Sequence, residues 1–321
     1  MELLFLGTSA AIPTRRRNVS ATAIRIEGNP AWHLVDCGEG TQHRLIGSGL
    51  TLSRLDTLFI SHVHGDHCFG LPGLLATASM QGRKTPLRLV APAAIQSILE
   101  VMLPATQTTL GFELDFIALE TLTQPLSIAD FEVEVTLLEH RTDSYAFAFS
   151  EKRLEGQLDT ARLKREGVPA GPLWGQLARA ETVEFAGKRL DGRDYIITGR
   201  APRKAILCGD NGNPECLTPL MPNTHLVMHE ATFLQAHLDA VGNQHGHSSA
   251  QLIARFCQKH QLPHLVLNHF SARYHSAEGM TALQSEAQSV YEGSLVLAND
   301  LHRVVLNKHF ELEQYAPQED H

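Results

Sequence analysis

Three histidines and one aspartate stand together in the segment SHVHGDH, which occupies residues 61 to 67 of the chain. Imidazole nitrogens and carboxylate oxygens are donors that suit zinc and similar divalent ions. The segment follows the apolar run TLFI at residues 57 to 60, so a strand that ends here would hold the donors close together. The competing interpretation, surface histidines near a turn, would need four donors to converge by chance. The pattern therefore predicts a metal-binding loop.

Other histidines and aspartates also follow short apolar runs. The residues placed in this way are Asp36, His62, His140, Asp210, His229 and His269. Chance would give two or three such coincidences rather than six. A site assembled from several strand ends on a rigid sheet has fixed ligand geometry, which catalysis requires. We expect these side chains to meet at one edge of a sheet.

Two divalent ions held about 3.5 to 4 Å apart can clamp a phosphate and activate water. Such a site needs six or seven ligands, at least one of which bridges the ions. The expected ligands are His62, His64 and His140 for one ion, Asp66, His67 and His269 for the other, and Asp210 between them. This division follows the order of the motif. Zinc is the expected metal, and manganese and magnesium are alternatives.

The remaining elements favour a sandwich of sheets covered by helices over a doubly wound parallel sheet. Helical patterns occupy residues 71 to 81, 93 to 103, 248 to 260 and 276 to 290. Ser248 and Ser276 are the expected N-caps of the last two helices. Strand-like runs at residues 3 to 6, 23 to 26 and 32 to 35 have the spacing of an antiparallel meander.

Residues 151 to 204 break the alternation of strands and helices. They have little strand periodicity, and the Gly/Pro-rich segment GVPAGPLWG at residues 167 to 175 lies at their centre. They hold twelve Lys or Arg against eight Asp or Glu, so this part carries +4 in a chain of −8. We expect a body formed by residues 1 to 150 and 205 to 312, an inserted basic arm at 151 to 204 and a polar tail at 313 to 321.

Composition narrows the classes of function. A chain of 321 residues that is 43% hydrophobic can bury a large core without disulfides. Its five cysteines are scattered, and no apolar stretch approaches a membrane span or a signal segment. The net charge of −8 argues against nonspecific binding of nucleic acid through overall charge. We expect a soluble, cytoplasmic protein that associates with neither membranes nor DNA.

The metal loop, together with the distant His140, Asp210 and His269, resembles the metallo-β-lactamase superfamily. Further segments resemble the short form of one of its branches, the ribonuclease Z family. They are FLGTS at residues 5 to 9, DCGEGTQ at 36 to 42, GLPG at 70 to 73, GVPAGPL at 167 to 173, HEAT at 229 to 232, GHSS at 246 to 249 and HFSARY at 269 to 274. The likeness covers nearly the whole chain. Ser249 and Asn211 stand where the family usually has Thr, and neither change removes a ligand.

The resemblance implies an α/β fold, namely an αβ/βα sandwich of two mixed sheets flanked by helices, with a protruding arm. It also implies a zinc-dependent endoribonuclease that hydrolyses the phosphodiester 3′ of the acceptor stem of precursor tRNA. The products would be a tRNA 3′-hydroxyl and a 5′-phosphate on the trailer. Asp66 would orient the attacking water and take its proton, and His229 or, as a second candidate, His247 would protonate the leaving oxygen.

The resemblance further implies where the substrate binds. Ser271 and Arg273 would grip phosphate near the cut, although a lone arginine is often a structural ion-pair partner. The arm would act as a clamp on the tRNA elbow through Lys164, Arg165, Gly171 and Pro172, whereas an ordinary solvated loop is its plainer interpretation. The short form is expected to be a homodimer.

Two other functions remain open at this point. One is a metallo-β-lactamase-fold phosphodiesterase or arylsulfatase that acts on small molecules, which needs the same ions but no arm. The other is a non-catalytic RNA-binding subunit, which the complete set of ligands disfavours. The physiological ion, the effect of a 3′-terminal CCA, any exonucleolytic trimming and the choice between the two histidines also stay open.

Overall fold

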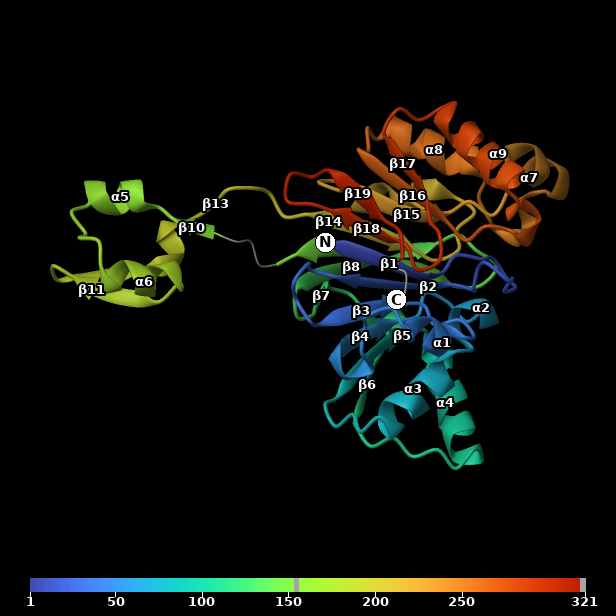
Figure 1. Ribbon diagram of the computed structural model, residues 1–321, viewed down its shortest axis with the longest axis horizontal. Coiled ribbons are helices and arrows are strands. Elements are labelled where there is room, and N and C mark those ends of the chain that lie inside the picture. Colours follow the sequence, from blue (N-terminus) through green and yellow to red (C-terminus); the bar gives the residue numbers. More distant parts are fainter. Residues whose placement is uncertain (153–155, 318–321) are drawn as a thin grey trace. The chain divides into compact units, whose positions relative to one another are not determined.

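The computed structural model describes residues 1–152 and 156–317. The chain divides into two compact units (Figure 1). The larger unit contains Met1–Ser150 and Arg203–His321, and the smaller unit contains Glu151–Pro202. Arg153, which belongs to the basic charges expected for the arm, lies outside the described residues.

The first sheet of the larger unit has eight strands in the order β19-β18-β1-β2-β3-β4-β5-β6. The pairs β1–β2 and β2–β3 are antiparallel, as the expected meander requires, and β3 to β6 are parallel. The sheet is therefore mixed. Its strands are β1 (Glu2–Gly7), β2 (Ala21–Arg25), β3 (Trp32–Val35), β4 (Leu55–Phe59), β5 (Leu87–Ala91), β6 (Leu114–Ala118), β18 (Arg303–Leu306) and β19 (Leu312–Tyr315).

The second sheet has seven strands in the order β17-β16-β15-β14-β9-β8-β7. Here β14 to β17 are parallel and β9 pairs antiparallel with β14. The strands are β7 (Leu126–Ser127), β8 (Phe131–Leu138), β9 (Ser144–Glu151), β14 (Lys204–Cys208), β15 (Leu226–Glu230), β16 (His264–Asn268) and β17 (Ser294–Leu297).

Three apolar cores join these layers. Between the sheets, the ring of Phe59 on β4 packs 5.0 Å from Phe147 and 5.3 Å from Phe149 on β9. Outside the first sheet, a second core contains residues of α3 (Leu71–Met80) and α4 (Ala93–Ala105). Outside the second sheet, a third core contains residues of α8 (Ala250–Lys259) and α9 (Ala277–Gln288) (Figure 1). Burial of aromatic and aliphatic surface on both faces of each sheet is the main stabilising contribution. The architecture is the αβ/βα sandwich expected from the sequence.

The helices of the larger unit are α1 (Thr41–Leu45), α2 (Gly65–Cys68), α3 (Leu71–Met80), α4 (Ala93–Ala105), α7 (Gln235–Val241), α8 (Ala250–Lys259) and α9 (Ala277–Gln288). The bounds of α3, α4, α8 and α9 agree with the four sequence patterns to within about a turn, whereas α1, α2 and α7 were not expected from the sequence. Short 3₁₀ helices are η1 (Leu52–Arg54), η2 (Leu119–Thr121), η4 (Pro214–Leu220), η5 (Asn243–His245) and η6 (Ala272–Tyr274). Within the described residues, no helix is long and apolar enough to span a bilayer.

Two local expectations were wrong. Ser249 rather than Ser248 caps α8, because the Ser249 hydroxyl accepts from the backbone N–H of Leu252 at 3.0 Å, whereas the Ser248 hydroxyl donates to a backbone carbonyl. Ser276 does cap α9.

The polar tail begins later than residue 313, because residues 313 to 315 belong to β19 and pair with β18.

The smaller unit has regular structure that the sequence patterns did not reveal. It contains β10 (Gly156–Leu158), α5 (Thr160–Arg165), α6 (Pro172–Ala178), β11 (Thr182–Phe185), β12 (Lys188–Asp191), η3 (Gly192–Tyr195) and β13 (Ile196–Thr198). Strands of three or four residues are too short to show an alternating pattern. A small core of its own includes Leu163, Leu177 and Tyr195.

The boundary of the smaller unit falls two residues before the expected one. Arg203 is fully buried in the larger unit, where its guanidinium donates to the Glu27 carboxylate at 2.8 Å, and Lys204 begins β14. These two cations therefore do not belong to the arm, and its excess of positive charge is correspondingly smaller.

Candidate metal centre

The metal loop follows β4 in the chain. It is also held in place by the carboxylate of Asp36, the residue directly after β3. Asp36 Oδ1 accepts from the backbone N–H of Ser61 at 2.7 Å, and its Oδ2 accepts from Nδ1 of His67 at 2.7 Å. Asp36 has a positive φ of 63°, which aspartate tolerates better than most residues. The short helix α2 then presents Asp66 and His67 on successive positions. The loop is therefore held by buried polar contacts as well as by the chain.

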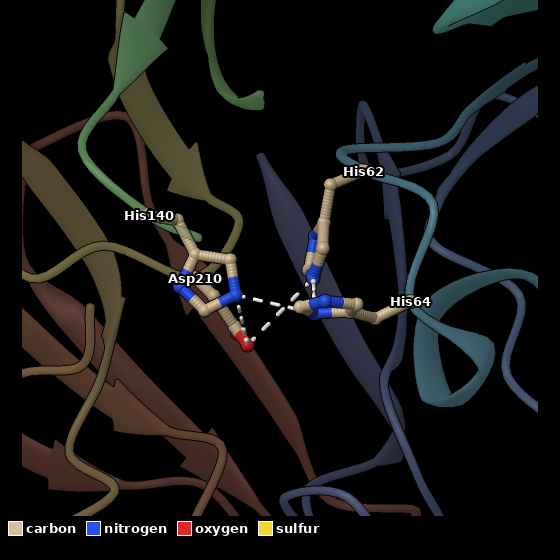
Figure 2. A group of neighbouring side chains, drawn as sticks. All are labelled: His62, His64, His140 and Asp210. Atoms are coloured by element: carbon tan, nitrogen blue, oxygen red, sulfur yellow. Dashed lines mark hydrogen bonds and ion pairs between the residues drawn. The ribbon is translucent and has the colours of Figure 1, made fainter. Parts of the chain in front are cut away.

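Four side chains form a first donor group (Figure 2). Nδ1 of His64 lies 3.1 Å from Nε2 of His62 and 3.2 Å from Nε2 of His140. Oδ2 of Asp210 lies 3.7 Å from Nε2 of both His62 and His140. The four side chains come from the ends of β4, β8 and β14 and point toward one another.

A second donor group lies on the other side of Asp210. Nε2 of His67 lies 3.3 Å from Nε2 of His269, and Oδ2 of Asp66 lies 3.6 Å from His67 and 3.4 Å from His269. Oδ1 of Asp210 is 3.4 Å from His67 and 3.3 Å from His269. The structure thus brings together all seven residues expected from the sequence, and Asp210 faces each group with a different oxygen.

The spacing of these donors fits a metal ion. A tetrahedral ion with bonds of about 2.0 to 2.1 Å separates its ligands by roughly 3.3 Å, which is near the distances in both groups. Four histidines also have a partner at the nitrogen turned away from the centre. These pairs are His62 with Ser61 Oγ at 3.0 Å, His67 with Asp36 at 2.7 Å, His140 with the Gly246 carbonyl at 2.7 Å and His269 with Thr232 Oγ1 at 3.0 Å. Donation there leaves the lone pair of Nε2 directed inward, so the cluster is compatible with a metal site.

The buried side chains of the cluster shift one another's pKa values. Burial lowers the pKa of His62 well below its ordinary value, and the charge of His67 lowers it further. Burial opposes the charged form of Asp210, but His269 and His67 hold its pKa well below the usual range. The pKa of Asp66 is also lowered despite its burial, chiefly by its hydrogen bond from His269. The carboxylates are thus ionised, which is the form that binds metals.

The two candidate proton donors have different surroundings. His229 on β15 is fully buried, and its Nε2 lies 3.1 Å from the amide nitrogen of Asn211. His247 lines the cleft above the donors, and its Nδ1 lies 3.1 Å from both carboxylate oxygens of Glu230. Burial lowers the pKa of His247, but the Glu230 carboxylate outweighs it and raises the pKa to about 9. His247 is therefore accessible from the cleft and paired with a carboxylate, whereas His229 is covered.

A cleft with a volume of about 550 Å³ is lined by five of the seven donor residues, namely His64, Asp66, His140, Asp210 and His269. Ser271 and Arg273 line it, and the Arg273 guanidinium lies over the ring of Phe233 at 5.4 Å. The other expected substrate contacts lie in the smaller unit. There Lys164 and Arg165 are exposed at the end of α5, and Gly171 and Pro172 are exposed at the start of α6.

Several residues at the centre had no assigned role in the sequence-based site, although Asp36 was expected at the same edge of the sheet. Asp36, Glu230 and Thr232 belong to quoted segments, so their motifs offered a signal, but their contacts to His67, His247 and His269 become visible only in the fold. The backbone groups of Ala11 and Gly246 offered no signal, because a main-chain amide or carbonyl is present at almost every residue. Phe69, which lines the cleft, was also missed.

Proteins similar to this chain were found among curated sequences. Ribonuclease Z of Pseudomonas putida (strain GB-1) is 48% identical over 312 residues, which cover 96% of this chain and 98% of that protein. This chain belongs to the ribonuclease Z family. Ribonuclease Z of Marinobacter nauticus is 42% identical and covers 98% of this chain and 99% of its own length. Membership in the ribonuclease Z family makes the protein a hydrolase of the endoribonuclease class.

A family model described as "Anti-Pycsar protein Apyc1" matches residues 1–162, which contain the metal loop and His140. Because the match spans half of the chain, the chain belongs to that sequence family as well. Ribonuclease Z membership rests on the longer matches, which also include Asp210 and His269.

Solved structures agree with this assignment. The crystal structure of the short form of human tRNase Z superposes with a TM-score of 0.67 at 26% identity and covers 96% of this chain and all of that chain. The metallo-β-lactamase fold protein YhfI from Bacillus subtilis gives a TM-score of 0.66 at 17% identity over 98% of this chain and 99% of its own, a likeness of fold alone. The fold expected from the sequence, that of the metallo-β-lactamases, is confirmed.

Proposed function

We propose that this protein is the endoribonuclease that cuts precursor tRNA 3′ of the acceptor stem, leaving a tRNA 3′-hydroxyl and a 5′-phosphate on the trailer. The observation that carries the proposal is the position of Asp210, which offers one carboxylate oxygen to each of two donor groups beside a cleft. Membership in the ribonuclease Z family supplies the class of substrate.

Two divalent cations per subunit are the proposed cofactors. His62, His64 and His140 would hold one ion and Asp66, His67 and His269 the other, with Asp210 shared. Five imidazoles in this set favour zinc over magnesium, and manganese is intermediate. When bound, such a pair supplies Lewis acidity toward phosphoryl oxygens and a more acidic water.

Side chains around the metal site carry out the proton transfers and bind the substrate phosphate. Asp66 orients the attacking water and accepts its proton, since its carboxylate is ionised and lines the cleft. His247 donates a proton to the leaving 3′-oxygen, because it is exposed to the cleft and the Glu230 carboxylate keeps it protonated. His229 is a buried positioning residue in this scheme. Ser271 and Arg273 bind phosphate oxygens beside the cut.

The smaller unit is the proposed substrate-binding arm. Several of its arginines are paired with acids of the same unit, including Arg162 with Glu166 and Arg193 with Asp191. Lys164 and Arg165 are exposed and stand outside these ion pairs, so they are among the cations that can meet RNA phosphates. Gly171 and Pro172 would approach the backbone of the RNA at the neighbouring turn.

We further propose a homodimer that works in the cytoplasm. The five free cysteines support a reducing compartment, since disulfides persist mainly in oxidising ones. Sedimentation velocity at micromolar concentration tests the dimer, and a single species at the mass of one 35.4 kDa chain would contradict it.

The deciding experiment incubates a 3′-extended tRNA precursor with metal-loaded protein and maps both product ends. A cut beyond the acceptor stem that yields a 3′-hydroxyl and a 5′-phosphate is expected, and Asp66→Ala is the inactive control. RNA that is bound but left intact with zinc, manganese or magnesium would instead indicate a non-catalytic RNA-binding subunit.

Removal of the arm separates RNA processing from a small-molecule activity. Ser150 and Lys204 are paired across β9 and β14, so a short Gly-Asn turn can replace residues 151 to 202 and keep Arg203. Hydrolysis of bis(p-nitrophenyl) phosphate should survive this change while cleavage of the precursor collapses. Equal loss or equal survival of the two activities would favour a phosphodiesterase or arylsulfatase of small molecules.

A further inference from the structure

We propose that Phe69 is a specificity-determining residue whose exposed ring stacks against an unpaired nucleobase next to the scissile phosphate. This inference rests on the proposed function, because it requires an RNA substrate. The site already described accounts for metal, water and phosphate, but none of its residues addresses the bases that flank the cut.

Phe69 is fixed close to the reacting centre by the fold of the metal loop. It ends helix α2, which carries Asp66 and His67, and its backbone N–H donates to the Gly65 carbonyl at 2.8 Å. Its ring lies over Gly65 so closely that a Cβ on that residue would come within 2.3 Å of the ring. The absence of a side chain at Gly65 therefore lets the ring rest directly on the backbone of the loop.

The ring is unusually exposed for an aromatic side chain. Phe69 is 68% exposed, whereas its neighbours Cys68 and Leu71 are 5% and 1% exposed. Phenylalanine normally buries most of its surface in a core or an interface. A single exposed apolar residue needs no explanation, but Phe69 lines both the metal cleft and an apolar groove of about 290 Å³. The groove is lined mainly by residues of α3 and α4.

A nucleobase matches this position chemically. The bond to be cut lies beyond the acceptor stem, so the flanking nucleotides are unpaired and their faces are free to stack. Stacking on an aromatic ring tolerates any base, which suits an enzyme that must process precursors with different trailers. Arg273 and Arg141 line the same cleft and are suited to phosphate, so an aromatic platform and cations serve one nucleotide strand together.

Substitution of Phe69 tests the stacking directly. For Phe69→Ala and Phe69→Leu we expect kcat/KM on the precursor to fall on the order of 10- to 100-fold, and for Phe69→Tyr we expect little change. The metal content of the three purified variants should equal that of the wild type, because the substituted ring holds no metal. Met80→Ala is the matched control, because Met80 is an 81% exposed apolar residue at the end of α3. Full activity of Phe69→Leu on the precursor would overturn the proposal.

A precursor with an abasic nucleotide identifies which nucleobase stacks on the ring of Phe69. Precursors with an abasic nucleotide on either side of the cut should be processed more slowly by the wild-type protein at one of the two positions. Phe69→Ala should show no further loss at that position. Equal abasic penalties in both proteins would overturn the proposal. A change in sedimentation caused by Phe69→Ala would do the same, because it would assign the ring to contacts between copies of the chain.

Failure of the proposed function gives a different result. In that case the wild-type protein would hydrolyse the small ester and leave every precursor intact. If the wild-type protein cleaves the precursor and the Phe69 variants cleave it equally fast, only the proposal that Phe69 stacks on a nucleobase would be rejected.

Discussion

The backbone N–H of Ala11 donates a 2.8 Å hydrogen bond to Oδ2 of Asp66, the carboxylate proposed as ligand and base. Ala11 has a φ of +61°, and the N–H of Ile12 donates to the Ala10 carbonyl at 2.7 Å, so residues 10 to 12 form a γ-turn of the rare, strained hand. The hydroxyl of Ser9 donates to the Ile12 carbonyl at 2.6 Å and braces the turn. These hydrogen bonds hold the Ala11 amide against Asp66 in spite of the local backbone strain.

Substitution of Ala11 should reveal the role of this turn. Ala11→Gly tolerates the positive φ and should hydrolyse bis(p-nitrophenyl) phosphate at nearly the wild-type rate. Ala11→Val places a β-branched residue where it is strongly disfavoured, so the amide should leave Asp66. Loss of a hydrogen bond to a charged group, worth about 1.5 to 3 kcal/mol, predicts a rate lower by roughly 10- to 100-fold. Ile12→Ala is the neighbouring control, and equal rates for Val and Gly at position 11 would contradict this role.

The contact between Asp36 and His67 leads to a second prediction. Asp36→Asn replaces one acceptor oxygen by an N–H donor, so Nδ1 of His67 and the hydroxyl of Ser61 lose part of their shared partner. Loss of such a supporting contact typically weakens metal binding about 10- to 100-fold. Competition with a chelator measures the change. Asp115→Asn, at a half-buried carboxylate on β6 that pairs with Arg88, should leave metal affinity unaltered, and an unaltered affinity in Asp36→Asn would contradict the prediction.

The catalytic roles of His229 and His247 can be distinguished with two substrates whose leaving groups differ in acidity. A 3′-hydroxyl needs a proton as it departs, whereas p-nitrophenolate does not. His247→Asn should therefore lower kcat on the precursor by about 10²- to 10⁴-fold and affect bis(p-nitrophenyl) phosphate far less. His229→Asn should reduce both activities to a similar degree, because the residue is buried and supports the fold. A selective effect of His229→Asn on the precursor would restore the original order of the two candidates.

The seven donor residues could be predicted because sequence and topology agree at those positions. An apolar run that ends in His or Asp identifies both a strand and the edge at which it delivers a side chain, as β14 does for Asp210. The ranking of His229 and His247 could not be obtained in this way. Neighbouring residues of a strand face opposite sides, and only the assembled sheets determine that His229 is covered while Glu230 reaches His247.

Much of what supports the site has no sequence pattern. The carbonyl of Gly246 that accepts from His140 and the amide of Ala11 that donates to Asp66 are main-chain groups, whose positions depend on loops closed by distant segments. The strands of the smaller unit also could not be predicted from a sequence pattern. Each is only three or four residues long and gains its stability from tertiary packing around Leu163 and Tyr195.

Charge reversal in the smaller unit should act on RNA alone. Lys164→Glu with Arg165→Glu replaces two exposed cations by anions, so KM for the precursor should rise and its dependence on salt concentration should become weaker. The rate on bis(p-nitrophenyl) phosphate should not change, because that ester is too small to need a second binding region. Arg54→Glu with Lys84→Glu, which reverses two exposed cations of the larger unit, is the matched control. An equal rise of KM in the control would show that overall charge, rather than the arm, is responsible.

His33 makes the stability of the larger unit depend on pH. The residue lies fully buried on β3, and burial lowers its pKa from 6.5 to about 4, although the carboxylate of Asp56 at 3.5 Å opposes this shift. Its ring otherwise packs edge-on against Phe131. Between these two pKa values the unfolded chain binds a proton that the folded chain does not. The free energy of unfolding therefore does not vary with the titration of His33 above pH 6.5, and it decreases as the pH falls from 6.5 toward 4.

The size of this effect follows from the shift, which corresponds to at most about 3 kcal/mol of unfolding free energy. Urea unfolding at pH 7.5 and pH 4.5 should show a smaller loss of stability for His33→Leu than for the wild type, since leucine does not titrate. The variant also removes two buried nitrogens that have no hydrogen-bond partner among the described residues. His309→Leu, at an exposed position, should keep the wild-type pH dependence. Parallel pH profiles for His33→Leu and the wild type would mean that His33 titrates equally in the folded and unfolded chains.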